Sequence, residues 1–187
     1  MSFFEYIEHL DQQLLLFINA QHSPFLDDVM WIISSKSFPI PFYILVAVLL
    51  FYKLGIKHAL IAVAIIAASV GLADLISNEV FKMTIQRYRP THNYDIKEQV
   101  RIINDYSGGL YGFVSSHAAN MFAFATGSLL FIKQKWATIL LLIFAVMVGY
   151  SRIYLGVHYP LDVIGGAMVG AFVACLLYGG WRLVFRG

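Results

Sequence analysis

The chain has 187 residues, of which 59% are hydrophobic and 13% are charged. Soluble domains carry about 25% charged residues on average, so this composition predicts an integral membrane protein. The net charge of +2 comes without the run of basic residues that nucleic-acid-binding chains carry, so nucleic acid is not expected as a partner.

Residues 1–21 have the pattern of an amphipathic helix. Apolar side chains recur at helical spacing, and acidic and amide side chains fill much of the rest. The segment is too polar to span a bilayer readily, so we expect a helix that lies in the membrane interface; a first membrane span is the alternative. A signal peptide is not expected, because Glu5, Glu8 and Asp11 stand where a positive segment should be.

Long apolar runs fill most of the remaining chain and show no strand-like alternation. They predict helices, because helices satisfy their own backbone hydrogen bonds inside a bilayer. The expected helices cover residues 25–34, 41–52, 57–86, 115–132, 136–150 and 160–184. We therefore predict an all-α, polytopic membrane bundle of about five to six transmembrane helices, with the N-terminal interfacial helix, in one domain over residues 1–187.

The one long polar segment, residues 91–114, is expected to be a surface loop. The alternation of spans puts the chain near Lys82, Ser115 and His158 on one face of the membrane. The opposite face carries basic residues in short loops and at the C-terminus: Lys53, Lys57, Lys133, Lys135, Arg182 and Arg186. Basic residues in short loops mark the cytoplasmic side, so the first face is expected to be outward, periplasmic in a bacterial inner membrane.

The segment from Ser151 to Asp162 places an arginine, a histidine and a carboxylate at the membrane edge, where polar groups are costly and usually functional. Pro160 suits the first turn of a helix, which puts His158 just before that helix and Asp162 about one turn further on. The carboxylate can then accept the Nδ1–H of the imidazole and leave Nε2 free as a nucleophile or base. A helix-capping histidine beside an interfacial aspartate is the structural alternative.

Three polar residues follow one another at four-residue steps on one face of the long helix: Asp74, Asn78 and Lys82. Asp74 and Asn78 could orient Lys82, or they could pair with a neighbouring helix. Arg87 could assist Arg89 in binding phosphate, or it could have no part in the site.

Three motifs occur in order: Lys82-x6-Arg89-Pro90, Ser115-Ser116-His117 and Ser151-Arg152-x5-His158-x3-Asp162. Together they resemble the signature of the type 2 phosphatidic acid phosphatase superfamily of membrane lipid phosphatases. The first and third motifs match in residue type and spacing. The second departs from the family pattern Pro-Ser-Gly-His, because this chain has Val114-Ser115-Ser116-His117. The motifs lie within residues 82–162.

The resemblance implies a phosphatase that forms a phosphohistidine intermediate. His158 would attack phosphorus, Asp162 would fix its tautomer, and His117 would protonate the leaving oxygen and then activate water. The resemblance assigns phosphate binding to Lys82, Arg89, Ser115, Ser116 and Arg152. No metal or other cofactor is expected, because three cations already neutralise the phosphate.

We therefore predict metal-independent hydrolysis of a membrane lipid phosphate or diphosphate. A polyprenyl (undecaprenyl) diphosphate ranks first, and phosphatidic acid, phosphatidylglycerophosphate and a lipid A phosphate are the alternatives. A non-catalytic lipid-binding or transport protein and a phosphotransferase are the alternatives from other classes. The expected partners are the substrate lipid and the bilayer, and no obligatory protein partner is evident.

Overall fold

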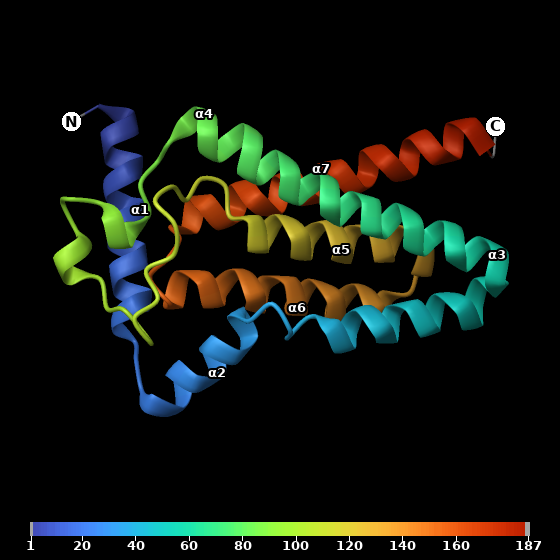
Figure 1. The fold of residues 1–187 in the computed structure, drawn as a ribbon, viewed down its shortest axis with the longest axis horizontal. Coiled ribbons are helices and arrows are strands. Elements are labelled where there is room, and N and C mark those ends of the chain that lie inside the picture. Colours follow the sequence, from blue (N-terminus) through green and yellow to red (C-terminus); the bar gives the residue numbers. More distant parts are fainter. Residues whose placement is uncertain (1, 186–187) are drawn as a thin grey trace.

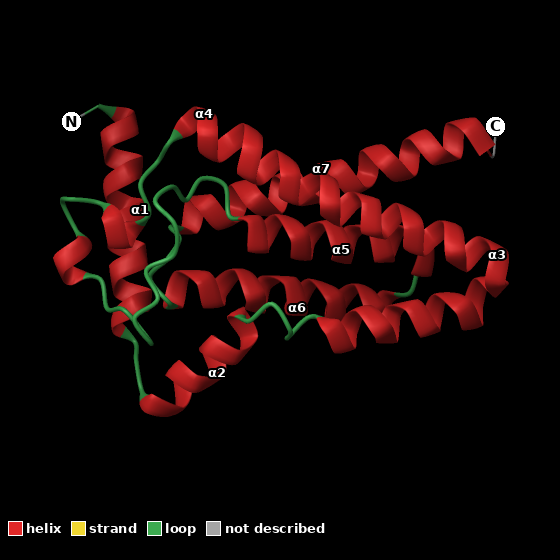
Figure 2. Cartoon of the chain, viewed as in Figure 1, coloured by secondary structure: helices red, strands yellow, loops and turns green. Residues whose placement is uncertain are grey.

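The computed structural model describes residues 2–185, and its regular elements are helices throughout that range (Figures 1 and 2). An isolated bridge between Tyr88 and Tyr111 is the sole strand-like pairing among the described residues. The all-α prediction is confirmed, while Arg186 lies outside the described residues. The elements are α1 (Phe3–Ala20), α2 (Pro24–Ser34), α3 (Ile40–Leu75), a π-helical turn η1 (Ile76–Lys82), α4 (Met83–Ile85), the 3-10 turns η2 (Pro90–His92) and η3 (Lys97–Gln99), α5 (Ser116–Ile132), α6 (Lys135–Tyr154) and α7 (Pro160–Phe185).

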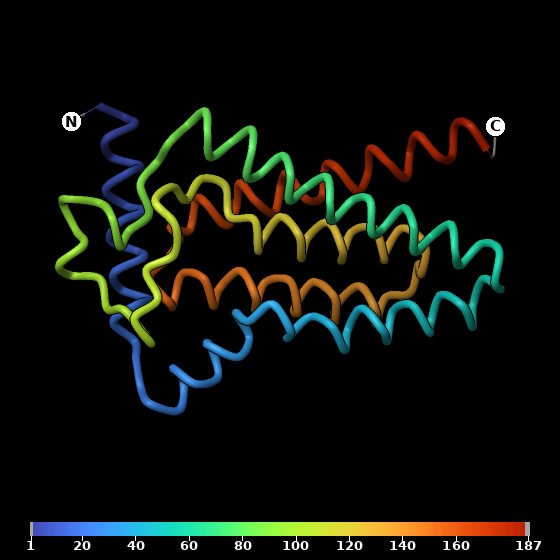
Figure 3. The backbone as a smooth tube through the Cα atoms, viewed as in Figure 1, coloured from blue at the N-terminus to red at the C-terminus, as the bar shows by residue number. Residues whose placement is uncertain are grey.

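Helix α3 consists of two limbs that reverse direction at Gly55 (Figure 3). Gly55 has a φ of 72°, a left-handed conformation that a residue without Cβ adopts at little cost. The sequence predicted separate helices over 41–52 and 57–86. The structure keeps both limbs and makes the turn at this glycine. The limbs meet at Gly55 and diverge toward the other end of the bundle, with α5 and α6 between them in the view of Figure 1.

Three described helices are long and apolar enough to cross a membrane: Ile40–Ile85, Lys135–Tyr154 and Pro160–Phe185. The first continues through α3, η1 and α4 and includes the reversal at Gly55. Helix α5 is shorter, and most of its first half is buried among its neighbours. These lengths and compositions suit a membrane bundle. The predicted number of five to six spans stays a prediction.

Helices α5 and α7 approach each other closely along a line of small residues. A Cβ atom on Gly166 would lie 2.4 Å from the backbone oxygen of Ser115, and one on Gly170 would lie 2.1 Å from the oxygen of Ala119. No side chain fits in that space, so glycine is required at both positions. The close contact brings the start of α5 to the start of α7, where the Ser115 N–H donates to the backbone oxygen of Asp162 at 2.9 Å.

Helix α1 lies crosswise to the bundle at the end where α5 and α7 begin (Figure 1). A reciprocal cap starts it: Ser2 accepts from the Glu5 N–H at 3.2 Å and donates its own N–H to the Glu5 carboxylate at 2.7 Å. The phenylalanines Phe3, Phe4 and Phe17 are exposed, whereas Asp11 is buried against the protein. The helix therefore presents apolar side chains outward and a carboxylate inward.

Candidate active site

A cavity of about 600 Å³ lies at the end of the bundle where α5 and α7 begin. Its wall contains a residue from each of the three sequence motifs. Six of the predicted site residues line it: Lys82, Arg89, Ser116, His117, Arg152 and His158. The other two, Ser115 and Asp162, are fully buried. The fold thus gathers residues from α3–η1, α5, α6 and the turn before α7 at one place.

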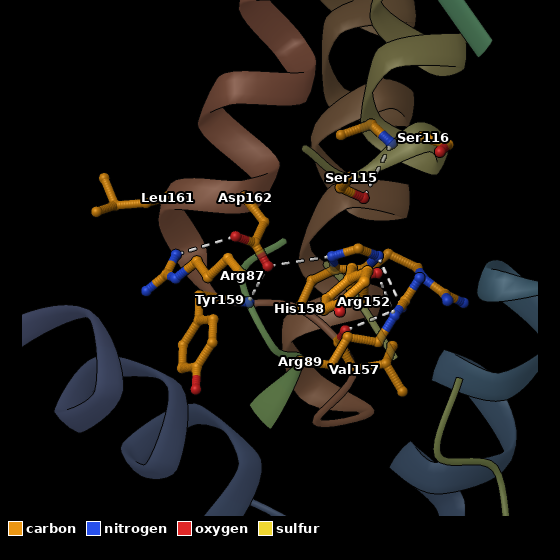
Figure 4. A network of polar contacts seen from close by, with 12 residues as sticks. Arg87, Arg89, Ser115, Ser116, Arg152, Val157, His158, Tyr159, Leu161 and Asp162 are labelled. Atoms are coloured by element: carbon orange, nitrogen blue, oxygen red, sulfur yellow. Dashed lines mark hydrogen bonds and ion pairs between the residues drawn. The ribbon is translucent and has the colours of Figure 1, made fainter. Parts of the chain in front are cut away.

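His158 lies in the turn between α6 and α7, with Asp162 in the first turn of α7 (Figure 4). The Nδ1 atom of His158 is 3.2 Å from Oδ2 of Asp162, and the same oxygen accepts the Tyr159 N–H at 3.0 Å. Pro160 starts α7, as the sequence predicted. The imidazole and its carboxylate are therefore held by the helix start itself.

The contact at the other ring nitrogen fixes the tautomer of His158. Nη1 of Arg89 is 3.0 Å from Nε2 of His158, and a guanidinium can only donate. Nε2 must therefore accept, which leaves the proton on Nδ1, facing Asp162. Burial, reinforced by the charges of Arg89 and Arg152, holds the pKa of His158 well below its usual range. The ring is neutral near pH 7, and its Nε2 lone pair accepts from Arg89 at the cavity wall.

The three predicted phosphate-binding cations, Lys82, Arg89 and Arg152, form no ion pair with a carboxylate among the described residues. Arg89 donates to the backbone oxygens of Tyr111 and Val157 at 3.1 and 3.0 Å. Burial and the nearby charge of Arg152 lower the pKa of Arg89 to about 10, so it stays charged near pH 7. Uncompensated cations around a cavity suit an anionic ligand.

Arg152 is 2% exposed, and its guanidinium contacts the hydroxyls of Ser34 and, at 3.1 Å, Tyr106. Its Nε atom is buried without a hydrogen-bond partner among the described residues. Buried donors normally have partners, so this arginine is held at a cost in the absence of a ligand. Tyr106 and Ser34 were missed by sequence reasoning, because nothing near them in the chain links them to the third motif.

Lys82 belongs to a row of polar side chains that joins η1 to α5. Its Nζ atom donates to Oδ1 of Asn78 at 2.6 Å and to the Ser116 hydroxyl at 2.7 Å. Asp74 accepts from Asn78 at 3.1 Å and from Asn120 at 2.8 Å. Both roles that the sequence left open are therefore present: Asp74 and Asn78 orient Lys82, and they also pair with a neighbouring helix.

The second motif starts α5. The Ser115 hydroxyl caps the helix and lies 3.5 Å from the Ala118 N–H, so it faces the helix rather than the cavity. Ser116, at the position of the family glycine, is not among the residues with positive φ. Its hydroxyl accepts from Lys82 and donates to Asn78 at 2.9 Å. The extra side chain is thus used as a partner for the lysine.

This contact predicts the effect of restoring the family residue. Ser116→Gly removes a hydrogen bond to a charged group, which is typically worth about 1.5–3 kcal/mol, so we expect kcat/KM for phosphate release to fall about tenfold or more. In Ser116→Ala, which keeps the Cβ and lacks the hydroxyl, kcat/KM should fall by a similar factor. Ser116→Thr, which keeps a hydroxyl, should retain most activity. Steady-state phosphate release checks this. Faster turnover in Ser116→Gly would contradict the assignment.

Arg87 does not line the cavity. Its guanidinium lies between two carboxylates, 3.0 Å from Oδ1 of Asp162 and 2.8 Å from Oδ2 of Asp11. The sequence left two roles open for Arg87, and the structure supports neither. Arg87 does not lie beside Arg89 at the cavity, and it does contact a predicted site residue, Asp162. Asp11 was missed, because on sequence it is one of several polar residues of an amphipathic helix.

A neutral buried histidine that faces unpaired cations, at one end of an apolar helical bundle, defines the site of a membrane enzyme for phosphoryl transfer. Residues 58–185 match the PAP2 superfamily, and the chain belongs to that superfamily. It is therefore a lipid phosphatase of the PAP2 type and an integral membrane protein. The predicted family and enzyme class are confirmed.

Two relatives align over nearly the whole chain and are named lipid A 4′-phosphatase. The protein of Bacteroides thetaiotaomicron is 36% identical over 97% of this chain and 78% of its own length. The protein of Porphyromonas gingivalis is 35% identical over 93% of this chain and 74% of its own length. An undecaprenyl-diphosphatase of Bacillus subtilis, BcrC, is 28% identical over 85% of this chain and 77% of its own length.

Two solved structures share the fold. LpxE of Aquifex aeolicus superposes with a TM-score of 0.71 at 25% identity, covering 89% of this chain and 93% of that one. A PAP2-type phosphatidylglycerolphosphate phosphatase of Bacillus subtilis gives a TM-score of 0.70 at 22% identity, covering 97% of this chain and 89% of that one. The helical arrangement is therefore that of known membrane phosphatases.

Proposed function

We propose that this enzyme removes a phosphate from lipid A, at the 4′ position, by way of a phosphohistidine. The chemistry rests above all on one observation: buried His158, with Nδ1 on Asp162 and Nε2 on Arg89, lines a cavity whose cations have no carboxylate partners among the described residues. The substrate rests on the two relatives named lipid A 4′-phosphatase, each aligned over more than nine-tenths of this chain. Lipid A thus moves ahead of undecaprenyl diphosphate, which the sequence ranked first.

In the first step, Arg89 transfers its hydrogen bond from Nε2 of His158 to a phosphate oxygen, Nε2 attacks phosphorus and the bond to the lipid oxygen breaks. The negative charge of the bound phosphate offsets the cations around the cavity and so favours the protonated form of His117. His117, which lines the same cavity, then gives its proton to that oxygen. Asp162 stabilises the positive imidazole through the Nδ1–H. Lys82, Arg89 and Arg152 hold the phosphate oxygens as charge spreads over them.

In the second step, His117 takes a proton from water, the water oxygen attacks phosphorus, and the N–P bond breaks. Inorganic phosphate leaves, and His158 regains its neutral form. Water as the acceptor makes the enzyme a hydrolase. No step requires a metal ion, and the described residues contain no group of three or more His, Cys, Asp and Glu side chains that could hold one.

An apolar pocket of about 380 Å³ adjoins the cavity, and Tyr43, Val70 and Gly71 line both. It lies between the two limbs of α3 and is lined almost wholly by apolar residues, including Val46, Leu50, Val63, Ile66, Ala67 and Phe124. We assign this pocket to an acyl chain, with the phosphate in the cationic cavity. The polar and apolar spaces then match the two parts of a lipid phosphate.

The site is proposed to face the periplasm. Four lysines lie at the two chain reversals at the other end of the bundle, which are the turn at Gly55 and the connection from α5 to α6: Lys53, Lys57, Lys133 and Lys135. Short loops rich in lysine favour the cytoplasmic side. The crosswise α1, with exposed Phe3, Phe4 and Phe17, would then lie in the outer interface of the inner membrane.

The substrate assignment is tested by phosphate release from purified protein in detergent with EDTA. The panel contains lipid A, undecaprenyl diphosphate, phosphatidic acid and phosphatidylglycerophosphate. We expect the highest kcat/KM on lipid A, with mass spectrometry showing loss of the 4′-phosphate. A higher kcat/KM on undecaprenyl diphosphate would restore the first ranking. Transfer of phosphate to an acceptor other than water would instead make the enzyme a phosphotransferase.

The acyl-chain pocket predicts a substitution with a selective effect. Ala67→Phe fills the pocket, and exclusion of two methylene groups corresponds to about 1.6 kcal/mol, so KM for lipid A should rise about tenfold. Hydrolysis of a soluble phosphomonoester, p-nitrophenyl phosphate, should be unchanged. Ala68→Phe is the matched control, because Ala68 is also exposed but does not line the pocket. Equal effects of both substitutions on KM would remove the assignment.

A further inference from the structure

The hydrogen-bonded row behind His158 continues beyond Asp162 to a second carboxylate, on α1. Arg87 donates through Nη1 to Oδ1 of Asp162 at 3.0 Å (Figure 4), and through Nη2 to Oδ2 of Asp11 at 2.8 Å. The other Asp11 oxygen accepts the Leu161 N–H, in the first turn of α7, at 2.9 Å. Helix α1 is thereby joined to the imidazole by an unbroken series of contacts.

Burial of these charged side chains costs free energy unless they are paired. The side chains of Asp11 and Asp162 are 2% and 0% exposed, and Arg87 between them is 19% exposed. Buried carboxylates are costly unless paired, and one guanidinium serves both. Burial raises the pKa of Asp11, while Arg87 and the Leu161 N–H oppose the rise. The guanidinium also lies 4.0 Å from the centre of the Tyr159 ring, which limits its movement.

We propose that Arg87 and Asp11 are positioning residues for phosphoryl transfer: Arg87 keeps Asp162 ionised and oriented so that His158 presents Nε2 to the phosphate, and Asp11 holds the Arg87 guanidinium in place. The inference rests on the proposed function of His158 as the nucleophile. Neither residue lines the cavity, so neither contacts the substrate. They act through Asp162, whose described ion pairs are with Arg87 and His158.

The physical reason lies in what Asp162 does without Arg87. Two buried carboxylates would then share one region with no guanidinium between them, and Asp162 would bind a proton. A protonated carboxyl donates to Nδ1 instead of accepting from it. The imidazole proton moves to Nε2, and that atom loses the lone pair that attacks phosphorus.

Other charges near Asp162 do not replace Arg87. The acidic group near the His158–Asp162 pair is Asp11 of α1, with Glu8 next to it. The cationic groups are Lys82 of η1, Arg87 and Arg89 after α4, and Arg152 of α6. The other titratable groups are His117 of α5 and Tyr159 before α7. Lys82, Arg89 and Arg152 line the cavity and would be neutralised by bound phosphate. Arg87 is on the opposite side, where its charge remains available to the carboxylate.

Asp11 lies outside residues 58–185, the part of the chain that matches the superfamily. The last carboxylate in the row from His158, that of Asp11, therefore belongs to a helix that the family match does not include. Docking of α1 against Arg87 and the start of α7 then completes the support of the nucleophile. Helix α1, which the sequence predicts to lie in the membrane interface, then also has a part in catalysis.

The kinetic test compares Arg87→Gln, Arg87→Lys and Asp11→Asn with wild type. For Arg87→Gln we expect kcat to fall about a hundredfold, with KM within about twofold of wild type. This fall in kcat is smaller than the one caused when a catalytic histidine is held wholly in the wrong tautomer. Because Asp162 would bind its proton more readily, the acidic limb of the kcat profile should move to higher pH. Arg87→Lys, which keeps the charge, should recover most of the rate. Asp11→Asn should lose less, and the double variant should be no slower than Arg87→Gln alone.

Arg101→Gln is the matched control. Arg101 is also paired with a carboxylate on the same face, Asp27 of α2, and makes no contact with His158 or Asp162. Thermal unfolding of each variant reports on folding. If Arg87→Gln does not fold, the kcat values of Asp11→Asn and Arg87→Lys test the positioning role in its place. An Arg101→Gln variant with the same shift in its pH profile, or an Arg87→Gln variant with an unshifted one, would overturn the proposal.

A measurement on the enzyme without substrate tests the role of Arg87 independently of the proposed function. ¹⁵N spectra of ring-labelled histidine, recorded near pH 7, report which nitrogen of His158 carries the proton. We expect the Nδ1–H form in wild type and a large share of the Nε2–H form in Arg87→Gln. The spectra decide the role of Arg87 even if no lipid in the panel is hydrolysed. An unchanged tautomer in Arg87→Gln would exclude that role.

Discussion

His158→Ala is expected to lower phosphate release by about 10⁴-fold or more, because removal of a covalent nucleophile leaves only binding and charge stabilisation. No other described residue can take its place with the same geometry, since His158 alone is held by Asp162 at Nδ1 and by Arg89 at Nε2. Orthovanadate, which forms a five-coordinate adduct with a nucleophile, should inhibit wild type. The measurement is phosphate release, with vanadate binding followed separately.

The matched control is His92→Ala. His92 lies in η2, after the first motif, and its ring contacts the Thr91 hydroxyl at 3.0 Å without lining the cavity. Its activity should stay within about twofold of wild type, as is usual for substitutions away from a site. Residual turnover in His158→Ala above about a hundredth of wild type would exclude a phosphohistidine at this position.

The sequence predicted those parts of the site that depend on local spacing. His158 and Asp162 are four residues apart around a helix start, and Pro160 marks that start, so the carboxylate contact at Nδ1 follows from the chain itself. Asp74, Asn78 and Lys82 share a face at four-residue steps, and they are hydrogen-bonded in that order. Short-range geometry of this kind is set by helix periodicity.

Contacts between distant elements could not be predicted in the same way. Asp11 and Arg87 are 76 residues apart, and their ion pair depends on how α1 lies across the bundle end. Gln86 adopts a φ of 51° just after α4, and Arg87, which follows it, is not among the residues that line the cavity. The π-helical turn Ile76–Lys82 also differs from the uninterrupted helix that the sequence predicted. Periodicity does not reveal such departures, because tertiary packing decides them.

The same argument explains why the family residue at position 116 was a poor guide. A glycine there would let backbone approach phosphate closely, whereas the serine of this chain adds a side chain at that point. Its hydroxyl instead accepts from Lys82, whose other partner is Asn78. The departure is part of a row that includes Asp74 and Asn120, both also on the cavity wall. The motif residues are therefore best understood together with the side chains that hold them.

Arg152→Lys is expected to cause the second-largest loss, about 10²–10³-fold in kcat/KM. This is the effect of removing one preorganised donor to a charged transition state. A lysine keeps the charge but lacks the planar fork, so it cannot contact Tyr106 and phosphate oxygens together. The unpartnered Nε of Arg152 also disappears with the substitution. Because charge on the phosphate oxygens changes as the P–O bond breaks, most of the loss should appear in kcat.

Arg101→Lys provides the comparison for Arg152→Lys, because it makes the same chemical change at an arginine that contacts Asp27 and no cavity residue. It should leave kcat/KM within about twofold of wild type. Vanadate affinity should fall in Arg152→Lys and not in Arg101→Lys, since vanadate presents the same oxygens as the transition state. Wild-type vanadate affinity in Arg152→Lys would mean that the Arg152 guanidinium does not bind the phosphate oxygens. The cationic cavity would then depend on Lys82 and Arg89 alone.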